Sequence, residues 1–187
     1  SAASDVYKRQ SGGSLQGTDW NLHNNSEQGL YIDSATVVVD GLTSSDNGFS
    51  AAHVFDARYV TFSNVTSTND GSLGSNAMEQ AGLSYQKSND LETASGDVSC
   101  LNCHVEASQG HGVYVFDSVD LWLDNLSITD IDTSLPAMFV DNGGLTLGTQ
   151  GGRFNLMNAN IDHESLTQPA LYIEQAAGNI DGLTLLG

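Results

Sequence analysis

Residues Phe116–Ser127 read FDSVDLWLDNLS and contain the pattern that decides the fold. An acidic residue is followed eight positions later by Asn or Gly, then by an apolar residue, and then by Ser or Thr. The same pattern occurs in Ile32–Thr43 (IDSATVVVDGLT), in Phe55–Thr66 (FDARYVTFSNVT) and in Ile173–Thr184 (IEQAAGNIDGLT). Self-similarity with a period of about 20 to 50 residues predicts a stack of repeated structural units.

Looser copies place the Asn or Gly position, which we call the bend, at three further sites. The bend residues are, in chain order, Asp19, Gly41, Asn64, Asn102, Asn125, Asn158 and Gly182. Their successive spacings are 22, 23, 38, 23, 33 and 24 residues, so the base period is about 23 and two repeats are longer. Gly, Asn and Asp accept a left-handed backbone at the least cost, which explains the composition of this position.

Apolar and polar residues alternate on both sides of the bend. The positions two and four before it are apolar in most copies, as at Val37 and Val39, and the position directly after it is apolar in every copy. This period of two predicts one half-buried strand that ends at the bend and another that begins there. A third strand precedes the acidic residue. Its copies are Gly29–Ile32, Gly112–Val115 and Ala170–Ile173.

Three short strands in each repeat of about 23 residues predict an all-β fold, a right-handed parallel β-helix of about seven coils. The Asn-rich bend between apolar residues resembles the pectate-lyase-like β-helix superfamily over about residues 15 to 187. This resemblance is one of pattern and carries no catalytic signature. The two longer repeats predict inserted loops at Ser67–Ala94 and Thr129–Gln150, and a short helix is expected over Asn76–Lys87. An all-β sandwich is the alternative, but sandwiches do not keep a turn residue at one fixed period.

The N-terminal segment Ser1–Gln10 differs from the rest and carries Lys8 and Arg9, two of the five basic residues. It resembles translated adaptor sequence of metagenomic libraries, and the alternative is a disordered N-terminus. We therefore place the β-helix domain at residues 11–187. Neither end shows the polar cap that covers the open sheet edges and core of a solenoid. We expect a fragment whose natural neighbour is the remainder of a longer parent chain.

The charge balance excludes several classes of partner. The chain has 187 residues, 23 acidic and five basic, and a formal net charge of −18. Such acidity disfavours nucleic acids and anionic membrane surfaces, which attract basic proteins. No apolar run approaches the roughly 20 residues of a membrane span, so membrane insertion is not expected. The acidity fits an extracellular or cell-surface location.

The strand before the bend offers the most informative outward surface. Alternation turns residues one, three and five before the bend outward, so Asp120 and Arg153 are expected to be neighbours on successive coils. Trp122 is expected to stand exposed among charged and amide side chains, as in a platform on which a sugar ring stacks. The candidate ligand-binding residues are Tyr59, Asp97, Asp120, Trp122, Asp124, Arg153 and Asn155. The alternative is that an inserted loop covers Trp122.

Asp33 and Asp56 are the candidate metal ligands. Each lies eight residues before a bend, so we expect equivalent positions on consecutive coils, about 5 Å apart. Two carboxylates at that distance favour a shared hard cation or a raised pKa. Calcium is therefore the one metal considered for this pair, and the alternative is a pair of solvated acids at a strand start.

Cys100-Leu-Asn-Cys103-His104 matches C-x-x-C-H, the attachment motif of c-type haem. The repeat places both cysteines at apolar, inward positions and His104 at an outward position shared with Thr43 and Ser127. Buried cysteines behave as small hydrophobic residues. Core cysteines, free or cross-linked across the bend, are therefore preferred over the remote alternative of haem attachment.

Gly110-His111-Gly112 resembles the Gly-His-Gly element of polygalacturonase-type glycosidases. That family also needs clustered aspartates and a downstream Arg-x-Lys, whereas this chain has no Asp-Asp pair and no Arg-x-Lys. A lyase acting on an anionic polymer is disfavoured by the net charge of −18. We therefore expect a non-catalytic structural or ligand-binding module that contacts polysaccharide or glycan. The alternative is a polysaccharide-degrading hydrolase or lyase.

Overall fold

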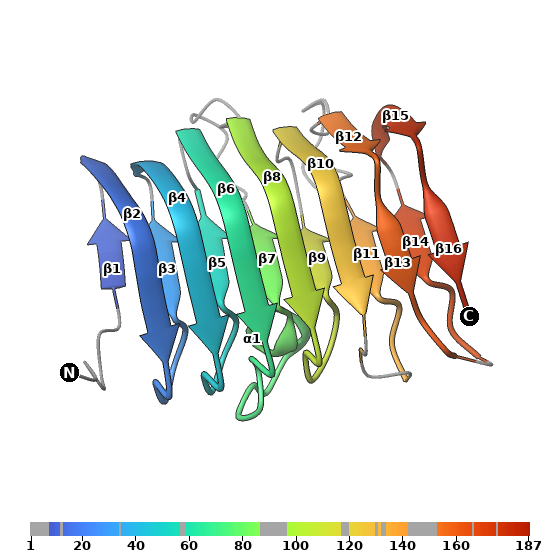
Figure 1. Cartoon of the computed structure of the whole chain (residues 1–187), viewed down its shortest axis with the longest axis horizontal. Helices are drawn as coiled ribbons and strands as arrows, with labels where there is room; N and C mark the ends of the chain where they lie inside the picture. Colours follow the sequence, from blue (N-terminus) through green and yellow to red (C-terminus); the bar gives the residue numbers. More distant parts are fainter. Residues whose placement is uncertain are drawn as a thin grey trace, which may run out of the picture.

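The protein has an all-β structure in which the paired strands are parallel (Figure 1). The computed structural model describes residues 8–11, 13–33, 35–56, 59–86, 97–116, 120–129, 131, 134–141, 153–165, 167–174 and 176–187. These ranges contain two sheets and a short helix, α1 (Ala77–Gln80). No helix in this part of the chain has the length and hydrophobicity needed to cross a membrane.

The larger sheet is built mainly from long strands that pass through the bend. Its order is β15-β12-β10-β8-β6-β4-β2, with β13 paired to β10 and β16 paired to β13. Its strands are β2 (Ser14–His23), β4 (Thr36–Ser45), β6 (Tyr59–Thr68), β8 (Asp97–Glu106), β10 (Asp120–Thr129), β12 (Arg153–Met157), β13 (Asn160–Asp162), β15 (Ala177–Asp181) and β16 (Thr184–Leu186). In the last two repeats the bend divides the long strand into two.

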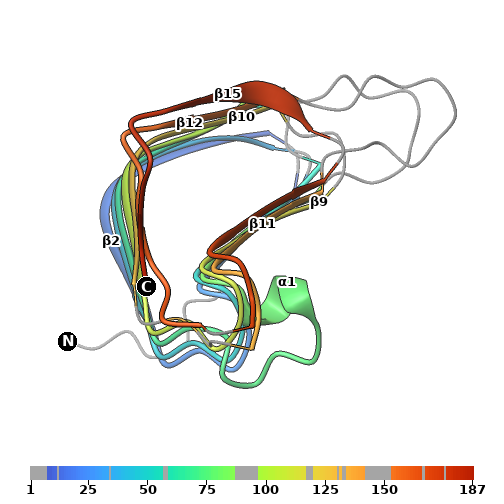
Figure 2. The ribbon, with the colours of Figure 1, turned by 90° about the vertical axis from the view of Figure 1, so that its right-hand side faces the viewer.

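The smaller sheet has the order β1-β3-β5-β7-β9-β11-β14. Its strands are β1 (Lys8–Ser11), β3 (Leu30–Asp33), β5 (Ala52–Phe55), β7 (Leu83–Gln86), β9 (Val113–Phe116), β11 (Met138–Asp141) and β14 (Leu171–Glu174). The chain alternates between the sheets and returns each time beside the preceding strand of that sheet. Figure 2, a view along the stacking direction, shows the strands of each sheet overlying one another. This parallel arrangement is compatible with a parallel β-helix.

The bend residues predicted from the sequence all have a left-handed backbone, with φ between 51° and 78°. The amide side chains of Asn64, Asn102 and Asn125 form a hydrogen-bonded ladder along this corner of the fold. Asn102 Nδ2 donates to Asn64 Oδ1 at 3.0 Å, and Asn125 Nδ2 donates to Asn102 Oδ1 at 2.9 Å. Asn therefore has two roles at this position, because it accepts the left-handed backbone and its side chain links neighbouring repeats.

The core is formed by the apolar positions on either side of the bend. Val39, Phe62 and Leu123, two residues before their bends, are fully buried, as is Leu42 directly after one. Burying each such large side chain contributes about 1.5 to 3 kcal/mol. Ile180 holds the equivalent position on β15 but is 44% exposed, because β15 is an edge strand with one neighbour.

A second left-handed corner lies five residues after each of the first four bends. The sequence pattern did not indicate it. Asn24, Asp46, Asn69 and Ala107 have φ between 53° and 56° at this corner. Asn69 Nδ2 donates to Asp46 Oδ1 at 2.7 Å, so part of this corner also carries a side-chain ladder. Ala107 departs from the Asn, Asp and Gly composition, which weakens the sequence signal.

A buried polar cluster lies next to the second corner. The carboxylate of fully buried Asp70 accepts hydrogen bonds from the Asn47 backbone N–H at 3.0 Å, from Asn47 Nδ2 at 2.8 Å and from Ser67 Oγ at 2.8 Å. Asn47 Oδ1 accepts in turn from Asn25 Nδ2 at 2.7 Å. Burial raises the pKa of Asp70, while these hydrogen bonds act in the opposite direction. The cluster links three neighbouring repeats and so helps to fix their register.

The extra residues of the two long repeats lie on both sides of a short strand. β7 falls inside the expected insertion Ser67–Ala94, and β11 falls inside Thr129–Gln150. The helix expected over Asn76–Lys87 is shorter, because Asn76 caps it, Gln80 ends it and strand β7 follows. β7 pairs with β5 and β9, and this backbone pairing overrides local helix propensity. The segments 87–96 and 142–152 lie outside the described residues.

The expected domain start at residue 11 falls inside β1. β1 pairs in parallel with β3, with Lys8 opposite Leu30 and Ser11 opposite Asp33. A sheet edge presents unpaired N–H and C=O groups, and an extended segment satisfies them largely regardless of its side chains. Strand pairing therefore extends to Lys8, inside the segment that composition sets apart. Residues 1–7 lie outside the described part of the chain.

Candidate functional site

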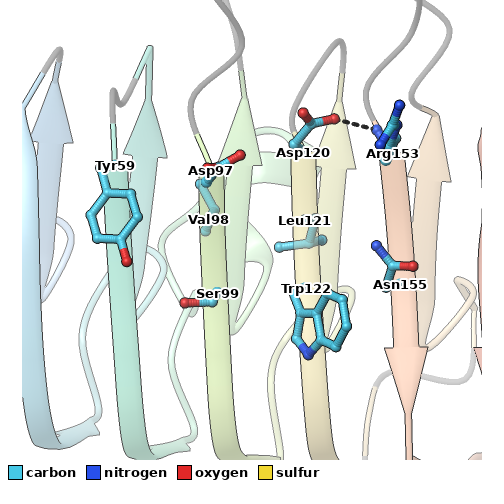
Figure 3. Close-up of a pocket in the computed structure, with 9 residues that line it drawn as sticks. All are labelled: Tyr59, Asp97, Val98, Ser99, Asp120, Leu121, Trp122, Arg153 and Asn155. Atoms are coloured by element: carbon cyan, nitrogen blue, oxygen red, sulfur yellow. Dashed lines mark hydrogen bonds between the residues drawn. The ribbon is translucent and has the colours of Figure 1, made fainter.

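A groove of about 410 Å³ lies on the outer face of the larger sheet, over the first halves of β6, β8, β10 and β12 (Figure 3). Its lining contains Tyr59, Asp97, Val98, Ser99, Asp120, Leu121, Trp122, Arg153 and Asn155. The structure thus brings together every candidate ligand-binding residue except Asp124. The volume falls within the range of about 300 to 1,000 Å³ that is usual for small-molecule sites.

Two rows of outward side chains run across the strands of the groove. The first row contains Tyr59, Asp97 and Asp120, and the second contains Ser99, Trp122 and Asn155. The residues between the rows face the core, so that Val98 and Leu121 are 2% and 1% exposed. Parallel strands lie about 4.8 Å apart, so each row makes a continuous surface. The alternation read from the sequence is confirmed here.

Trp122 supplies the main flat apolar surface of the groove. Its side chain is 48% exposed, whereas the alternative expectation was that an inserted loop covers it. Leu121 and Leu123 on either side are buried and anchor the strand beneath the indole. Tyr59, two strands away, is 47% exposed and adds a second aromatic ring.

Asp120 and Arg153 lie at one end of the groove. The Arg153 backbone N–H donates to Asp120 Oδ1 at 2.5 Å, and Figure 3 shows the two residues side by side. The sequence-based expectation that they are neighbours is therefore confirmed. The contact uses the main chain of Arg153, whose side chain is exposed.

Polar side chains of the second row are held by neighbouring strands. Asn179 Nδ2 donates to Asn155 Oδ1 at 3.2 Å, and Ser99 Oγ donates to Thr61 Oγ1 at 3.3 Å. Asn155 and Ser99 flank Trp122 on either side in the register. Side chains that are ordered before a ligand arrives lower the entropic cost of binding.

Asp124 does not line the groove. It lies beside the bend, where its Oδ1 accepts a hydrogen bond from Asn158 Nδ2 at 2.9 Å. Ser99, in contrast, lines the groove although it was not among the candidate residues. Its signal was present in the sequence, because it shares the position three before the bend with Trp122 and Asn155.

Asp33 and Asp56 do not occupy equivalent positions. The partner of Asp33 on the next strand is Phe55, and Asp56 follows β5 with a φ of 49°. The expectation was wrong because the corner between β5 and β6 contains one residue more than the corner between β3 and β4. Within the described ranges, no three His, Cys, Asp or Glu side chains lie close enough together to hold a metal ion.

Cys100 and Cys103 form a disulfide across the bend, and each residue is 1% exposed. The predicted core location is confirmed, and of its two expected states the cross-linked one is observed. A c-type haem thioether needs free thiols, whereas these two sulfurs are bonded to each other. His104 faces outward as expected, with its Nε2 atom 3.7 Å from Glu106 Oε2.

His111, the centre of the Gly-His-Gly element, is 3% exposed. Its Nδ1 atom donates to the Pro136 carbonyl oxygen at 2.6 Å. Its ring packs against Tyr114 and Phe139 with centroid distances of 5.3 and 5.5 Å. An imidazole held in this way joins the segment before β9 to the segment before β11.

The outer face of the smaller sheet carries an aromatic stack that the sequence-based selection missed. Tyr114, Phe139 and Tyr172 follow one another in register, with ring centroids 5.2 and 5.1 Å apart. Tyr31 stacks on His53 at 5.3 Å in the same manner. The signal was the Tyr shared by the third-strand copies. Because the ring faces contact one another, this stack stabilises the sheet and leaves little flat surface for a ligand.

His53 and Ser84 form a hydrogen-bonded pair within this sheet, with His53 Nδ1 2.9 Å from Ser84 Oγ. Burial lowers the pKa of His53 to about 4, and the charge of Glu79 on α1 opposes that shift. Ser84 is fully buried, so its hydroxyl is not placed to reach a substrate. The pair therefore belongs to the packing of β5 against β7.

No protein family, curated protein or solved structure matches this chain. The chemistry of the groove is therefore inferred from its own geometry. A half-exposed indole can stack on the apolar face of a ring, while the carboxylates, amide and hydroxyl beside it bind polar substituents on the rim. Among the described residues, this groove is where the candidate ligand-binding side chains converge.

Proposed function

We propose that the protein is a right-handed parallel β-helix module that binds carbohydrate in the groove around Trp122. One observation carries this proposal: an indole that is 48% exposed lies in a groove lined also by two carboxylates, a guanidinium and an amide. A sugar ring has an apolar face and a rim of hydroxyl groups. The groove offers a complementary group for each of these parts.

The β-helix assignment is supported by the repeat itself. Left-handed bends recur with a base period of about 23 residues, and the chain alternates between two parallel sheets. This is the arrangement implied by the resemblance to the pectate-lyase-like β-helix superfamily. In such a stack every repeat places its outward residues beside those of the next, which makes an extended binding face.

A secreted or cell-surface location is part of the proposal. The Cys100–Cys103 disulfide supports it, because disulfides persist mainly in oxidising compartments. The acidic chain, with its formal net charge of −18, supports it further. Calcium, which is abundant outside cells, is the one metal that we include in the binding test.

The direct test is a glycan array probed with the intact chain, with calcium and with a chelator. We expect binding to a subset of glycans and loss of that binding in Trp122→Ala. Leu101→Ala is the matched control, because Leu101 is 46% exposed on the adjacent strand and does not line the groove. Equal binding by wild type and Trp122→Ala, or no binding to any glycan, contradicts the proposal.

A polysaccharide-degrading enzyme is the second candidate. The observation in its favour is that Asp97 and Asp120 are neighbours in the groove, and paired carboxylates perform acid and base steps on a glycosidic bond. The test is release of reducing ends from array-positive polysaccharides, with Asp97→Asn and Asp120→Asn as controls. Release that both variants abolish favours the enzyme, whereas binding without release favours the non-catalytic module.

A further inference from the structure

The charges in the groove indicate which kind of sugar it takes. Its lining contains two carboxylates, Asp97 and Asp120, and one guanidinium, that of Arg153. Asp97 and Asp120 lie directly opposite each other on neighbouring strands. Like charges placed opposite each other in a sheet repel, so a cation between them is favoured.

The protein itself compensates these two carboxylates only in part, because the groove contains one guanidinium for two carboxylates. The only close contact between a basic and an acidic side chain among the described residues, His104 Nε2 to Glu106 Oε2 at 3.7 Å, lies away from the groove. Asp120 accepts a hydrogen bond from the backbone N–H of Arg153, which carries no formal charge. The groove therefore keeps a negative potential that a cationic ligand can neutralise.

Trp122 adds a second preference for positive charge. It lies two residues after Asp120, on the same outer face of β10, and Figure 3 shows its ring in the row of Ser99 and Asn155, next along the strands from the row that contains both carboxylates. The face of an indole attracts a cation by about 0.5 to 2 kcal/mol, depending on exposure. A sugar ring that stacks on Trp122 can therefore extend an ammonium group along the strands to the carboxylate row.

Resting on the proposed carbohydrate-binding function, we propose that the groove takes an amino sugar, a pyranose with a protonated amine. The ring stacks on Trp122 and the ammonium lies between Asp97 and Asp120. Sugars that carry carboxylates are repelled by the groove and by the formal net charge of −18. Acetylated amino sugars keep the ring but lack the charge, so they bind less tightly.

The test compares glucosamine oligomers with N-acetylglucosamine oligomers of the same length. Titrations use the intact chain at a mildly acidic pH, at which the sugar amine is protonated and an ordinary carboxyl group is ionised. We expect the glucosamine oligomer to bind about tenfold or more tightly. We also expect added salt to weaken its binding more than that of the acetylated oligomer.

Variants separate the charge from the stacking surface. Asp97→Asn combined with Asp120→Asn keeps shape and an acceptor oxygen but removes both charges, so it should weaken binding of the glucosamine oligomer more than that of the acetylated oligomer and remove the preference for the amine. Trp122→Ala should weaken both oligomers. The unfolding curve of each variant checks that it remains folded.

The outcomes distinguish this inference from the proposed function. Equal binding of both oligomers, or a preference that survives in the double Asn variant, overturns the amino-sugar inference and leaves carbohydrate binding in place. Binding of other array glycans, with no binding of the glucosamine oligomer, likewise overturns only the amino-sugar inference. Binding of no glycan at all overturns both.

Discussion

The Arg153 backbone N–H donates to Asp120 Oδ1 at 2.5 Å, although 33 residues separate the two in the sequence. The contact joins the first residues of two neighbouring strands, β10 and β12. It fixes one carboxylate of the groove next to Trp122 on one side and Arg153 on the other. A site built in this way depends on the register of the repeats.

The left-handed bend is tested by two substitutions of Asn125, whose φ is 55°. Asn125→Gly and Asn125→Val both remove the side-chain hydrogen bond to Asn102 Oδ1. Only Val also meets the steric cost of the left-handed region, about 1 to 2 kcal/mol. We expect the Val variant to be less stable than the Gly variant by that amount in urea unfolding. Equal stabilities of the two variants contradict the assigned bend.

The Cys100–Cys103 disulfide is expected to stabilise the fold modestly, since it closes a loop with a sequence separation of 3. The entropic estimate for so short a loop is about 2 kcal/mol. We expect Cys100→Ala combined with Cys103→Ala to lose roughly this free energy of unfolding. Reduced wild type is the control and should lose a similar amount. An unchanged unfolding midpoint on reduction contradicts the prediction.

The buried Asp70 is expected to matter through the donors that it satisfies. Asp70→Ala leaves the Asn47 backbone N–H and the Ser67 hydroxyl without their acceptor, whereas Asn47 Nδ2 still donates to Ser44 Oγ and the Leu22 carbonyl oxygen. Two unsatisfied buried donors cost about 3 kcal/mol or more. Asp70→Asn keeps one acceptor oxygen, and the Ser67 hydroxyl can rotate to accept from the new amide. We expect less than half the loss for Asn, measured by urea unfolding. Equal losses in the two variants contradict a hydrogen-bonding role.

The pH dependence of stability tests the burial of His53. Its pKa is lowered to about 4 in the folded protein, whereas the pKa of a His in the unfolded chain is about 6.5. The unfolded state therefore binds the proton first, and stability falls as the pH drops from about 6.5 to about 4, by up to about 3 kcal/mol.

His53→Phe is the matched variant for this measurement, because Phe139 holds the equivalent position on β11 and stacks in the same way. The unfolding free energy of wild type minus that of His53→Phe should decrease across this pH window. Contributions from Asp70, whose raised pKa acts in the opposite direction, cancel in the difference. A difference that stays constant with pH contradicts a buried, neutral His53.

Much of this site was predictable because its signals are local. The alternation around each bend placed Trp122, Asp97 and Asn155 on one outer face, and the fixed spacing from bend to strand start made Asp120 and Arg153 neighbours. Backbone pairing in a parallel sheet has a period of two, so a pattern anchored at the bend remains in phase along the strand.

The sequence-based expectations were wrong or incomplete where a residue's position is not fixed by its spacing from a bend. Asp33 and Asp56 are separated from their bends by a corner whose length changes by one residue, and pattern matching does not detect such a change. Helix propensity beyond Gln80 was overridden by strand pairing in β7, which depends on neighbours distant in the sequence. The second corner was hidden because Ala107 adopts the conformation that Asn holds in other repeats.

The central claim, that the groove around Trp122 binds carbohydrate, is tested most directly by titrating the best array-positive glycan into three proteins. Wild type, Trp122→Ala and Leu101→Ala are compared by isothermal titration calorimetry at the same protein concentration. We expect Trp122→Ala to weaken binding about tenfold or more, equal to about 1.4 kcal/mol, and Leu101→Ala to match wild type. Equal affinity of wild type and Trp122→Ala, or an equal loss in both variants, contradicts the claim.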